Sequence, residues 1–516
     1  MPRYSFRFEE ATIGDLQARM ESGRLTSRAL VRAYRRRIET VDRPGPGKVG
    51  LRAVLELNPD ADEIADELDA ERRRDGPRGP LHGIPILVKD NMDTADRMRT
   101  TAGSLALTGS RPKRDATVVE RLRAAGAVLL GKTNLSEWSN IRSPRSSSGW
   151  SGRGGQTRNP YALDRSPSGS SSGSAAAVAA NLAAGTLGTE TDGSIVCPAA
   201  ACNVVGIKPT VGLTSRAGVI PIAHSQDTVG PICRTVADAA TVLGALVGPD
   251  PRDPATADSE GRLQRDYRPF LDSGGLRTSR IGIPREVFYE YSPPAVEVAE
   301  QAIEALRAAG AEVVDPADIP GAREMAGFTG ERELEVLLYE LKHDLDAYLA
   351  ERGDRRIRSL ADVIAYNEAH ADTELRHFGQ EFLVAALAKG PLTDPAYLEA
   401  LAGNRRLSRE QGVDKVLRER NLDALLVPTS SPPWTIDLVN GDHVLGEGST
   451  PAALAGYPAV SVPAGYADGL PVGITFFGTA WSEPTLIRLA YAFEQATKVR
   501  RPPRFRSGGL SPTARP

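Results

Sequence analysis

The amino-acid sequence predicts an α/β fold, with a large mixed β-sheet covered by helices on both faces and a helical insertion. Short apolar runs alternate with amphipathic segments from about residue 51 to residue 250, and the same rhythm returns after residue 275. Residues 323–420, by contrast, have an almost wholly helical and more charged pattern. We expect a single domain over residues 1–516, made of an N-terminal helical region (1–75), a core (76–250), the helical insertion (323–420) and a C-terminal part of the core (421–500).

The first part of the chain is expected to be helical up to the first strand. Residues 12–41 have the pattern of two short amphipathic helices. Thr12 can cap the first helix and Thr26 or Ser27 the second, because hydroxyl side chains accept hydrogen bonds from the free N–H groups of a first turn. "LRAVLEL", residues 51–57, alternates apolar and polar residues as a half-buried strand does.

The middle of the chain repeats strands and helices. "GIPILV", residues 83–88, is a short apolar strand that ends abruptly at Lys89, and "DATVVERLRAAGAVLLGKTN" predicts a helix, a glycine stop and a strand. Residues 174–184 are apolar on nearly every helical face, which predicts a buried helix. The other expected elements are a charged helix at 60–74, a helix at about 235–247, the strand "RIGIPRE", a helix near 295–309, the strand "AEVVD", the strands "ALLVPT", "AVSVP" and "PVGITFF", and a helix at about 483–497.

The insertion at 323–420 is too long to be a simple connection between two core elements. Segments of this kind often cover or shape a binding cleft. A subdomain that only packs against the core is the alternative.

Composition and charge exclude several classes of protein. The chain has 63 Lys and Arg against 66 Asp and Glu, a net charge of −3 that gives no electrostatic reason to expect nucleic acid or a membrane as a partner. Three cysteines in 516 residues are not a disulfide framework. The N-terminus lacks the apolar segment of a secretory signal, and no apolar run approaches the ~20 residues that span a bilayer. We therefore expect a cytoplasmic protein.

A serine-rich run, "SPSGSSSGSAAAVAA" at residues 166–180, has three possible interpretations. A flexible linker is disfavoured, because the run leads directly into the predicted buried helix. Gly169 to Gly173 formally match the G-x-S-x-G nucleophile turn with Ser171 as nucleophile. That motif must follow an apolar strand, however, whereas the polar, proline-broken "RNPYALDRSPS" precedes it here. It also needs a later Asp and His, and only His443 is both late in the chain and near glycines.

The third interpretation comes from reading several segments together. "GIPILVKDN" places a lysine at the end of a buried strand, "SGSSSGS" offers a glycine-flanked hydroxyl, and "LGTETDGSIVCPAAACNVVGIKPT" presents a serine in a turn. With "GKTNLSEW" and the C-terminal "AGYPAVSVPAG…GLPVGITFFG", this ordered set resembles the amidase signature family of serine hydrolases over most of the chain.

The resemblance implies a role for each of three side chains. Lys89 matches the catalytic lysine of the family and Ser194 its nucleophile. Ser170, which lies 24 residues before Ser194, matches the bridging serine that the family holds in a cis peptide bond. In the family mechanism a proton passes from the nucleophile through the bridging serine to the lysine and returns to the departing amine.

The chemistry gives physical reasons for these residue types. Lysine acts as a base only when it is neutral, so burial must lower its pKa from the usual value of about 10.4. Asp90 need not pair with Lys89, because successive side chains of a strand point to opposite faces. An oxyanion hole is expected from backbone N–H groups, contributed by Thr191, Asp192, Gly193 and Ser194.

Two departures from the common family pattern bear on substrate class. Many members have "GTDxGGS" where this chain has "GTETDGS", which places Glu190 and Asp192 beside the nucleophile. A carboxylate near developing negative charge is unfavourable unless it points away. "GSSSGS" also replaces the usual "GGSSGG". These variants, with "SQDTVGP" and "LLYELKHDL…LADVIAYNEAH", look like the peptide amidase branch, which removes ammonia from C-terminal peptide amides.

Other members of the family have different tasks, which stay open as alternatives. One is the glutaminase subunit of a tRNA-dependent amidotransferase, which passes ammonia to a partner chain, and another is the hydrolysis of aliphatic or aryl amides. The helical insertion favours a stand-alone hydrolase. We expect no cofactor and no metal, an amide substrate that is a small molecule or a peptide, no nucleic-acid or membrane partner, and a monomer or homodimer.

Overall fold

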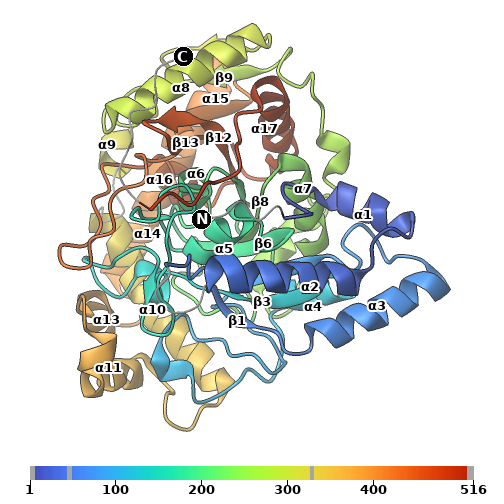
Figure 1. Ribbon diagram of the computed structural model, residues 1–516. Coiled ribbons are helices and arrows are strands. Elements are labelled where there is room, and N and C mark those ends of the chain that lie inside the picture. The colour runs from blue at the N-terminus through green and yellow to red at the C-terminus, as the bar shows by residue number, and fades with distance from the viewer. Residues whose placement is uncertain (1–5, 44–48, 326–330, 508–516) are drawn as a thin grey trace.

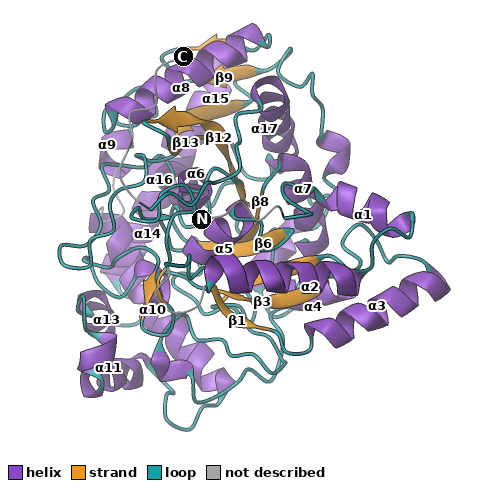
Figure 2. Cartoon of the chain, in the orientation of Figure 1, coloured by secondary structure: helices purple, strands orange, loops and turns teal. Residues whose placement is uncertain are grey.

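The computed structural model describes residues 6–43, 49–325 and 331–507. At its centre lies one mixed sheet of 11 strands in the spatial order β1-β3-β2-β6-β8-β7-β12-β13-β11-β9-β10, with helices on both faces (Figures 1 and 2). The predicted fold class is therefore confirmed. Within these ranges, none of the helices combines the length and the apolar character that crossing a bilayer demands.

The strands follow the apolar runs of the sequence. A separate two-stranded ribbon is formed by β4 and β5, and all the other strands belong to the large sheet. The bounds are β1 Val54–Leu57, β2 Pro85–Lys89, β3 Val128–Thr133, β4 Trp150–Ser151, β5 Gly155–Gln156, β6 Gly185–Glu190, β7 Val205–Lys208, β8 Thr228–Cys233, β9 Arg280–Gly282, β10 Glu312–Val314, β11 Ala424–Pro428, β12 Ala459–Ala467 and β13 Leu470–Phe477.

The α-helices begin largely where the sequence predicts, with Thr12 and Thr26 as the N-caps of the first two. Their bounds are α1 Ile13–Glu21, α2 Ser27–Arg37, α3 Ala61–Asp75, α4 Thr117–Ala124, α5 Ser172–Ala179, α6 Val196–Ala201, α7 Val236–Leu246, α8 Pro293–Ala308, α9 Ala322–Met325, α10 Glu331–Arg352, α11 Leu360–Ala369, α12 Ala371–Glu374, α13 Glu381–Leu387, α14 Pro395–Ser408, α15 Asp414–Arg420, α16 Thr450–Ala455 and α17 Glu483–Thr497.

Two elements are shorter than predicted, and a left-handed residue accounts for each. Helix α5 ends at Ala179, because Asn181 adopts a φ of 59°, which an α-helix does not accommodate. Strand β1 begins at Val54, because Arg52 adopts a φ of 55°. The spacing of apolar residues in the sequence does not reveal a left-handed backbone conformation at either Asn181 or Arg52.

The sheet topology brings two distant segments together. Strands β2 and β6 are parallel neighbours, with Val88 paired to Leu187. Because parallel strands end at the same edge of a sheet, Lys89 at the end of β2 and Glu190 at the end of β6 lie on one edge. In open α/β sheets, ligands bind outside this carboxyl edge.

The predicted helical insertion contains α9 to α15, and its residues 326–330 lie outside the described ranges. A hydrophobic cluster joins buried residues of α10, α11 and α13 to Leu135, Trp138 and Ile222 of the preceding segments. Figure 1 shows α10, α11 and α13 grouped on one side of the sheet, at the lower left of the view. The insertion therefore packs directly on the part of the chain that carries the carboxyl edge.

Arg142 is a polar link between this insertion and the core. Its buried guanidinium donates to the Glu137 carboxylate and to the carbonyl oxygens of Glu374 (2.7 Å) and Phe378 (3.2 Å). The charge also lies 4.0 Å from the centre of the Phe378 ring. Burial raises the pKa of Glu137, and the charge of Arg142 opposes that shift and so favours the carboxylate form. Removing the guanidinium therefore leaves a carboxylate buried without its counter-ion.

We expect Arg142→Met to lower the free energy of unfolding by about 3–5 kcal/mol, the usual cost of breaking a buried ion pair by removing one partner. Urea unfolding followed by fluorescence measures this as a lower midpoint with little change in slope. Arg323→Met is the control, because Arg323 pairs with Glu286 while 62% exposed, and its loss should leave the midpoint in place. Equal midpoints for Arg142→Met and the wild type would contradict the assignment of Arg142 as a structural link.

Candidate active site

Lys89 is the last residue of β2, and its side chain is fully buried. Its Nζ donates to the Ser170 Oγ at 2.7 Å and to the Thr189 Oγ1 at 2.7 Å. Burial lowers the pKa of Lys89 to about 7, although the charges of Asp227 and Glu190 oppose that shift. About half of an amine with this pKa is neutral at pH 7 and can act as a base.

Asp90, the next residue, is turned away from Lys89. Its carboxylate accepts from Arg153 at 3.3 Å and from the Thr101 hydroxyl. The alternation expected of a strand therefore separates this acid from the lysine. The Lys89 amine consequently has hydroxyl neighbours and no directly bonded carboxylate among the described residues.

Ser170 is buried, and its Oγ accepts the hydrogen bond from Lys89 Nζ. The Gly169–Ser170 peptide bond is cis. The Ser170 backbone carbonyl accepts from the N–H of Ser136 at 3.1 Å. The chain then enters α5 at once, and Gly173 allows this because a Cβ there would lie 2.4 Å from the carbonyl oxygens of Ala53 and Asn134. The serine run is thus a packed turn that leads into a buried helix.

The other hydroxyls of the run are occupied by structural hydrogen bonds. Ser171 Oγ donates to the Thr189 carbonyl at 3.0 Å and accepts from the Thr189 N–H at 3.2 Å. Ser172 Oγ donates to the Ser168 carbonyl at 2.6 Å, and Ser174 Oγ to the Leu187 carbonyl at 2.8 Å. Ser171 is fully buried, so its hydroxyl is poorly placed to attack a substrate.

Ser194 lies in the turn between β6 and α6 and is 8% exposed, unlike the fully buried Lys89 and Ser170. Its carbonyl accepts from the Ser171 N–H at 3.2 Å, which places the turn against the serine run. The hydrogen bonds of the described residues include none between the hydroxyls of Ser194 and Ser170. The structure thus brings Lys89 and Ser170 into direct contact, with Ser194 on the neighbouring turn.

The turn at residues 191–194 presents backbone N–H groups that are free within the protein. Among the described residues, none of these four N–H groups donates to a protein acceptor. Glu190 holds the chain just beyond the turn, because its Oε2 accepts from the N–H groups of Ile195 (2.7 Å) and Val196 (3.0 Å). Because Glu190 holds the chain that follows this turn, the free N–H groups of the turn have fixed positions and can stabilise an oxyanion.

The unusual Asp192 carboxylate is occupied by two hydroxyls of the segment that leads into α16. Its oxygens accept from Ser449 Oγ at 2.6 Å and Thr450 Oγ1 at 2.8 Å. Burial raises the pKa of Asp192, although these hydrogen bonds oppose the shift. The carboxylate that would disfavour an oxyanion hole is therefore directed at α16, and only the N–H of Asp192 belongs to the turn.

Sequence reasoning missed several polar residues that surround the three predicted ones. Thr189 is bonded to Lys89, and Asn91 Nδ2 donates to the same Thr189 Oγ1 at 3.0 Å. Asp227 accepts from Thr191 Oγ1 at 2.6 Å. All of these residues lie within the motifs "GIPILVKDN", "GTETDGS" and "SQDTVGP". Their position inside a matched motif was the one sequence feature that could have indicated a place near the active site.

A pocket of about 250 Å³ extends from this cluster to the insertion. One wall is the edge of the core, with Asn91, Thr189 and Thr191, and the facing wall is α10. The expectation that the insertion borders a cleft therefore has a physical counterpart here. The lining of the pocket also includes Ser139, Arg216, Ile220, Ile222, His224, Asp227, Asp344, Ala347, Tyr348 and Glu351.

The side chains of His82 and the three cysteines are buried in the protein interior and take part in packing. His82 is fully buried, with Nε2 2.9 Å from the Leu68 carbonyl oxygen. Cys197, Cys202 and Cys233 are buried and form no disulfide bond. One cluster that the sequence did not indicate joins His224 to Glu340 and Asp344 of α10.

Three comparisons place the chain among known proteins. The family model described as Amidase matches residues 29–487. The solved peptide amidase of Stenotrophomonas maltophilia is 55% identical, with a TM-score of 0.91 over 97% of this chain and 99% of that chain. A probable amidase of Arabidopsis thaliana is 46% identical over 506 residues, which cover 97% of this chain and 93% of the plant protein. A glutamyl-tRNA(Gln) amidotransferase subunit of Chloroflexus aurantiacus is 37% identical over 500 residues, 94% of this chain and 96% of the bacterial protein.

Proposed function

The chain belongs to the amidase signature family and is an amide hydrolase, and we propose that it removes ammonia from C-terminal peptide amides through Lys89, Ser170 and Ser194. The contact of the buried Lys89 Nζ with Ser170 Oγ, at 2.7 Å, carries this proposal. It supplies a base whose pKa is about 7 to a hydroxyl of the serine run, and the next residue of that run, Ser171, is hydrogen-bonded to the Ser194 carbonyl.

In the first half of the reaction, Ser194 Oγ attacks the carbonyl carbon of the amide. As it does so, the Ser194 proton passes to Ser170 Oγ while the Ser170 proton passes to the neutral Lys89 Nζ. The carbonyl oxygen becomes an oxyanion that accepts from the N–H groups of the turn at 191–194. The tetrahedral intermediate then expels ammonia, which takes its third proton from Ser170 as Lys89 returns one to Ser170.

In the second half, water attacks the acyl ester on Ser194. The water proton follows the same route through Ser170 to Lys89, and Ser194 recovers its proton when the ester bond breaks. The products are the carboxylic acid and ammonia, and the three side chains regain their starting protonation. No cofactor is required for this sequence of proton transfers.

The assignment to peptide amides rests on two kinds of support. The solved relative that is 55% identical over nearly its whole length is a peptide amidase. The pocket between the core and α10 can hold groups of the acyl part that lie away from the reacting amide. Binding energy from such remote groups can lower the barrier at the reacting amide.

We expect kcat/KM for ammonia release from an amidated dipeptide to exceed that for free glutamine by at least ~100-fold, a difference of about 2.7 kcal/mol in transition-state binding. A coupled ammonia assay on the purified chain measures both substrates side by side, with aliphatic and aryl amides in the same series. The Ser194→Ala variant supplies the background rate.

A glutaminase subunit of an amidotransferase is the second candidate, because the Chloroflexus protein of that kind is 37% identical over most of both chains. Preference for glutamine, or activity that requires a partner chain, would favour that role and overturn the peptide amidase assignment. A highest kcat/KM for simple aliphatic or aryl amides would favour the third candidate. The cytoplasmic location and the monomeric or homodimeric state remain predictions.

A further inference from the structure

Helix α10 of the insertion carries three acidic residues on one face, which we call the acidic stripe: Glu333, Glu340 and Asp344. Their spacings of seven and four residues repeat the helical period, so the three side chains point in one direction. Glu333 and Glu340 are buried. Buried carboxylates require hydrogen-bond donors, and each residue of the stripe finds at least one in the core segment at residues 222–227, which we call the support segment. The Tyr397 hydroxyl of α14 donates to the other oxygen of Glu340.

The stripe contacts three consecutive residues of the support segment. Asp344 Oδ2 accepts from the N–H of His224 at 3.0 Å and from its Nδ1 at 2.8 Å. Glu340 Oε2 accepts from the N–H of Ser225 at 2.9 Å. Glu333 Oε1 accepts from Gln226 Nε2 at 2.9 Å. Each acidic residue thus fixes a different point of the segment.

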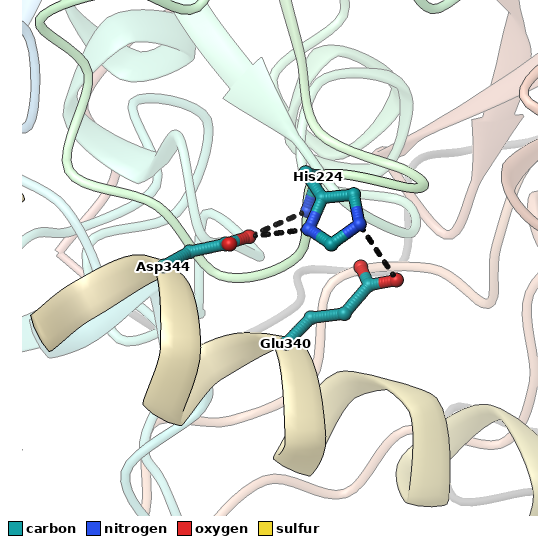
Figure 3. A group of neighbouring side chains, drawn as sticks. All are labelled: His224, Glu340 and Asp344. Atoms are coloured by element: carbon teal, nitrogen blue, oxygen red, sulfur yellow. Dashed lines mark hydrogen bonds and ion pairs between the residues drawn. The ribbon is translucent and has the colours of Figure 1, made fainter. Parts of the chain in front are cut away.

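Figure 3 shows two residues of the stripe, Glu340 and Asp344, with their carboxylates next to the His224 ring. Asp344 lies at Nδ1, and Glu340 Oε1 lies 3.4 Å from Nε2. Burial would lower the pKa of His224, but the hydrogen bond to Asp344 and the charges of both carboxylates raise it overall. A carboxylate at each ring nitrogen suits an imidazolium ion that clamps the segment to α10.

The support segment in turn holds Thr191, the first residue of the turn with free N–H groups. Gln226 Nε2 donates to the Thr191 carbonyl at 3.3 Å. Asp227 Oδ1 accepts from Thr191 Oγ1 at 2.6 Å, and Asp227 Oδ2 accepts from the N–H groups of Ile222 (2.8 Å) and Ala223 (3.0 Å). A continuous series of hydrogen bonds therefore runs from the insertion to the turn.

We propose that the acidic stripe positions the oxyanion hole: through Gln226 and Asp227 it fixes Thr191, so that the helical insertion contributes to the chemical step. The inference rests on the proposed role of the turn at 191–194. Gln226, Asp227 and Glu333 are positioning residues, since each acts on the substrate through the turn. Loss of one such residue should misalign the N–H donors while the donors themselves remain.

The test uses Gln226→Ala and Glu333→Ala in the full chain, on any amide that the wild type hydrolyses. We expect kcat to fall by about 10- to 100-fold in each, less than the ~10²–10³-fold loss that follows removal of an oxyanion donor, while KM changes little. Glu333→Gln keeps an acceptor for Gln226 and should retain most of kcat. Glu335→Ala is the matched control, because Glu335 lies on α10 outside the stripe and pairs with Lys389.

A second readout reports on the hole itself. A peptide aldehyde forms a tetrahedral adduct whose oxygen occupies the hole, whereas the corresponding peptide alcohol does not. The inhibition constant of the aldehyde should rise with the loss of kcat, and that of the alcohol should stay constant. If Gln226→Ala proves unstable, Thr191→Val can replace it, because this change removes only the hydroxyl bonded to Asp227. It should likewise raise the inhibition constant of the aldehyde and leave that of the alcohol unchanged.

The double variant Glu333→Ala, Gln226→Ala tests the connection between the two residues. We expect it to be no slower than Gln226→Ala alone, because both changes interrupt one path. Wild-type kcat in folded single variants, multiplied losses in the double variant, or equal weakening of aldehyde and alcohol would each overturn the inference. An error in the proposed substrate would appear differently, as a wild type that releases no ammonia from peptide amides.

Discussion

Ser194→Ala is expected to reduce kcat by about 10⁵- to 10⁶-fold, to the level of the uncatalysed background plus what binding and the oxyanion donors supply alone. The hydroxyl is the only group removed, and it is the one that forms the acyl ester. Ser194 is 8% exposed on a turn beside Ser170, so its loss should leave the fold intact. Ammonia release in a continuous assay measures the loss, and the urea midpoint verifies the fold.

Ser171→Ala and Ser172→Ala are the matched controls, because the same side-chain change is made at neighbouring serines of the serine run. Their hydroxyls serve the carbonyl oxygens of Thr189 and Ser168, respectively. We expect both variants to retain most of the activity, with some loss of stability. A folded Ser171→Ala variant as inactive as Ser194→Ala would return the nucleophile to the G-x-S-x-G turn.

Adding hydroxylamine to the assay distinguishes covalent catalysis through an acyl-enzyme from general-base catalysis by water alone. Wild-type enzyme that turns over an amide in the presence of hydroxylamine should form the hydroxamate of the acyl group, because the acyl ester on Ser194 can be intercepted. Ser194→Ala should form none. This outcome depends on the ester and not on the identity of the physiological substrate.

Local sequence patterns predicted the elements that carry the site, since each lies in a short segment. The apolar run before Lys89 predicted a strand that ends at the lysine, and the strand is Pro85–Lys89. The alanine-rich segment predicted a buried helix, and all residues of α5 are buried. The roles of Lys89, Ser170 and Ser194 came from the ordered family motifs, because neither spacing nor composition links Lys89 to Ser170, 81 positions further along the chain.

What the sequence could not give is the set of contacts made between distant elements. Thr189 meets Lys89 across the β2–β6 pair, and Glu333 meets Gln226 across more than 100 positions of sequence. An acidic residue on a charged helix is usually solvated, so the stripe on α10 resembled an ordinary surface before the fold was known. Its burial against the support segment is a product of tertiary packing alone.

Lys89→Ala is expected to lower kcat by about 10⁴-fold, because the variant keeps the nucleophile and the oxyanion donors but has no acceptor for the Ser170 proton. His443→Ala is the control, since the lysine mechanism requires no histidine and His443 is exposed. Comparable losses in the two variants would favour a serine–histidine mechanism.

The pH profile of the wild type gives an independent measure of the same base. Burial lowers the pKa of Lys89 to about 7, so the amine is protonated and inactive below that pH and neutral above it. We therefore expect kcat/KM to rise tenfold per pH unit below about 7 and to level off above it. A flat profile between pH 5 and pH 9 would exclude a free-enzyme base with this pKa.

Asp227→Asn identifies which group causes the inflection. The negative charge of Asp227 favours the protonated lysine and so opposes the effect of burial on the pKa of Lys89. Asp227 itself has a pKa raised by burial to about 6, so it is largely ionised where Lys89 titrates. Removing that charge should move the inflection of kcat/KM to lower pH, while the isosteric amide of Asn can still form a hydrogen bond with the Thr191 hydroxyl. An inflection that disappears with Asp227 would show that the rate follows the carboxyl group and not the lysine, and one that moves to higher pH would contradict the effect of the Asp227 charge on Lys89.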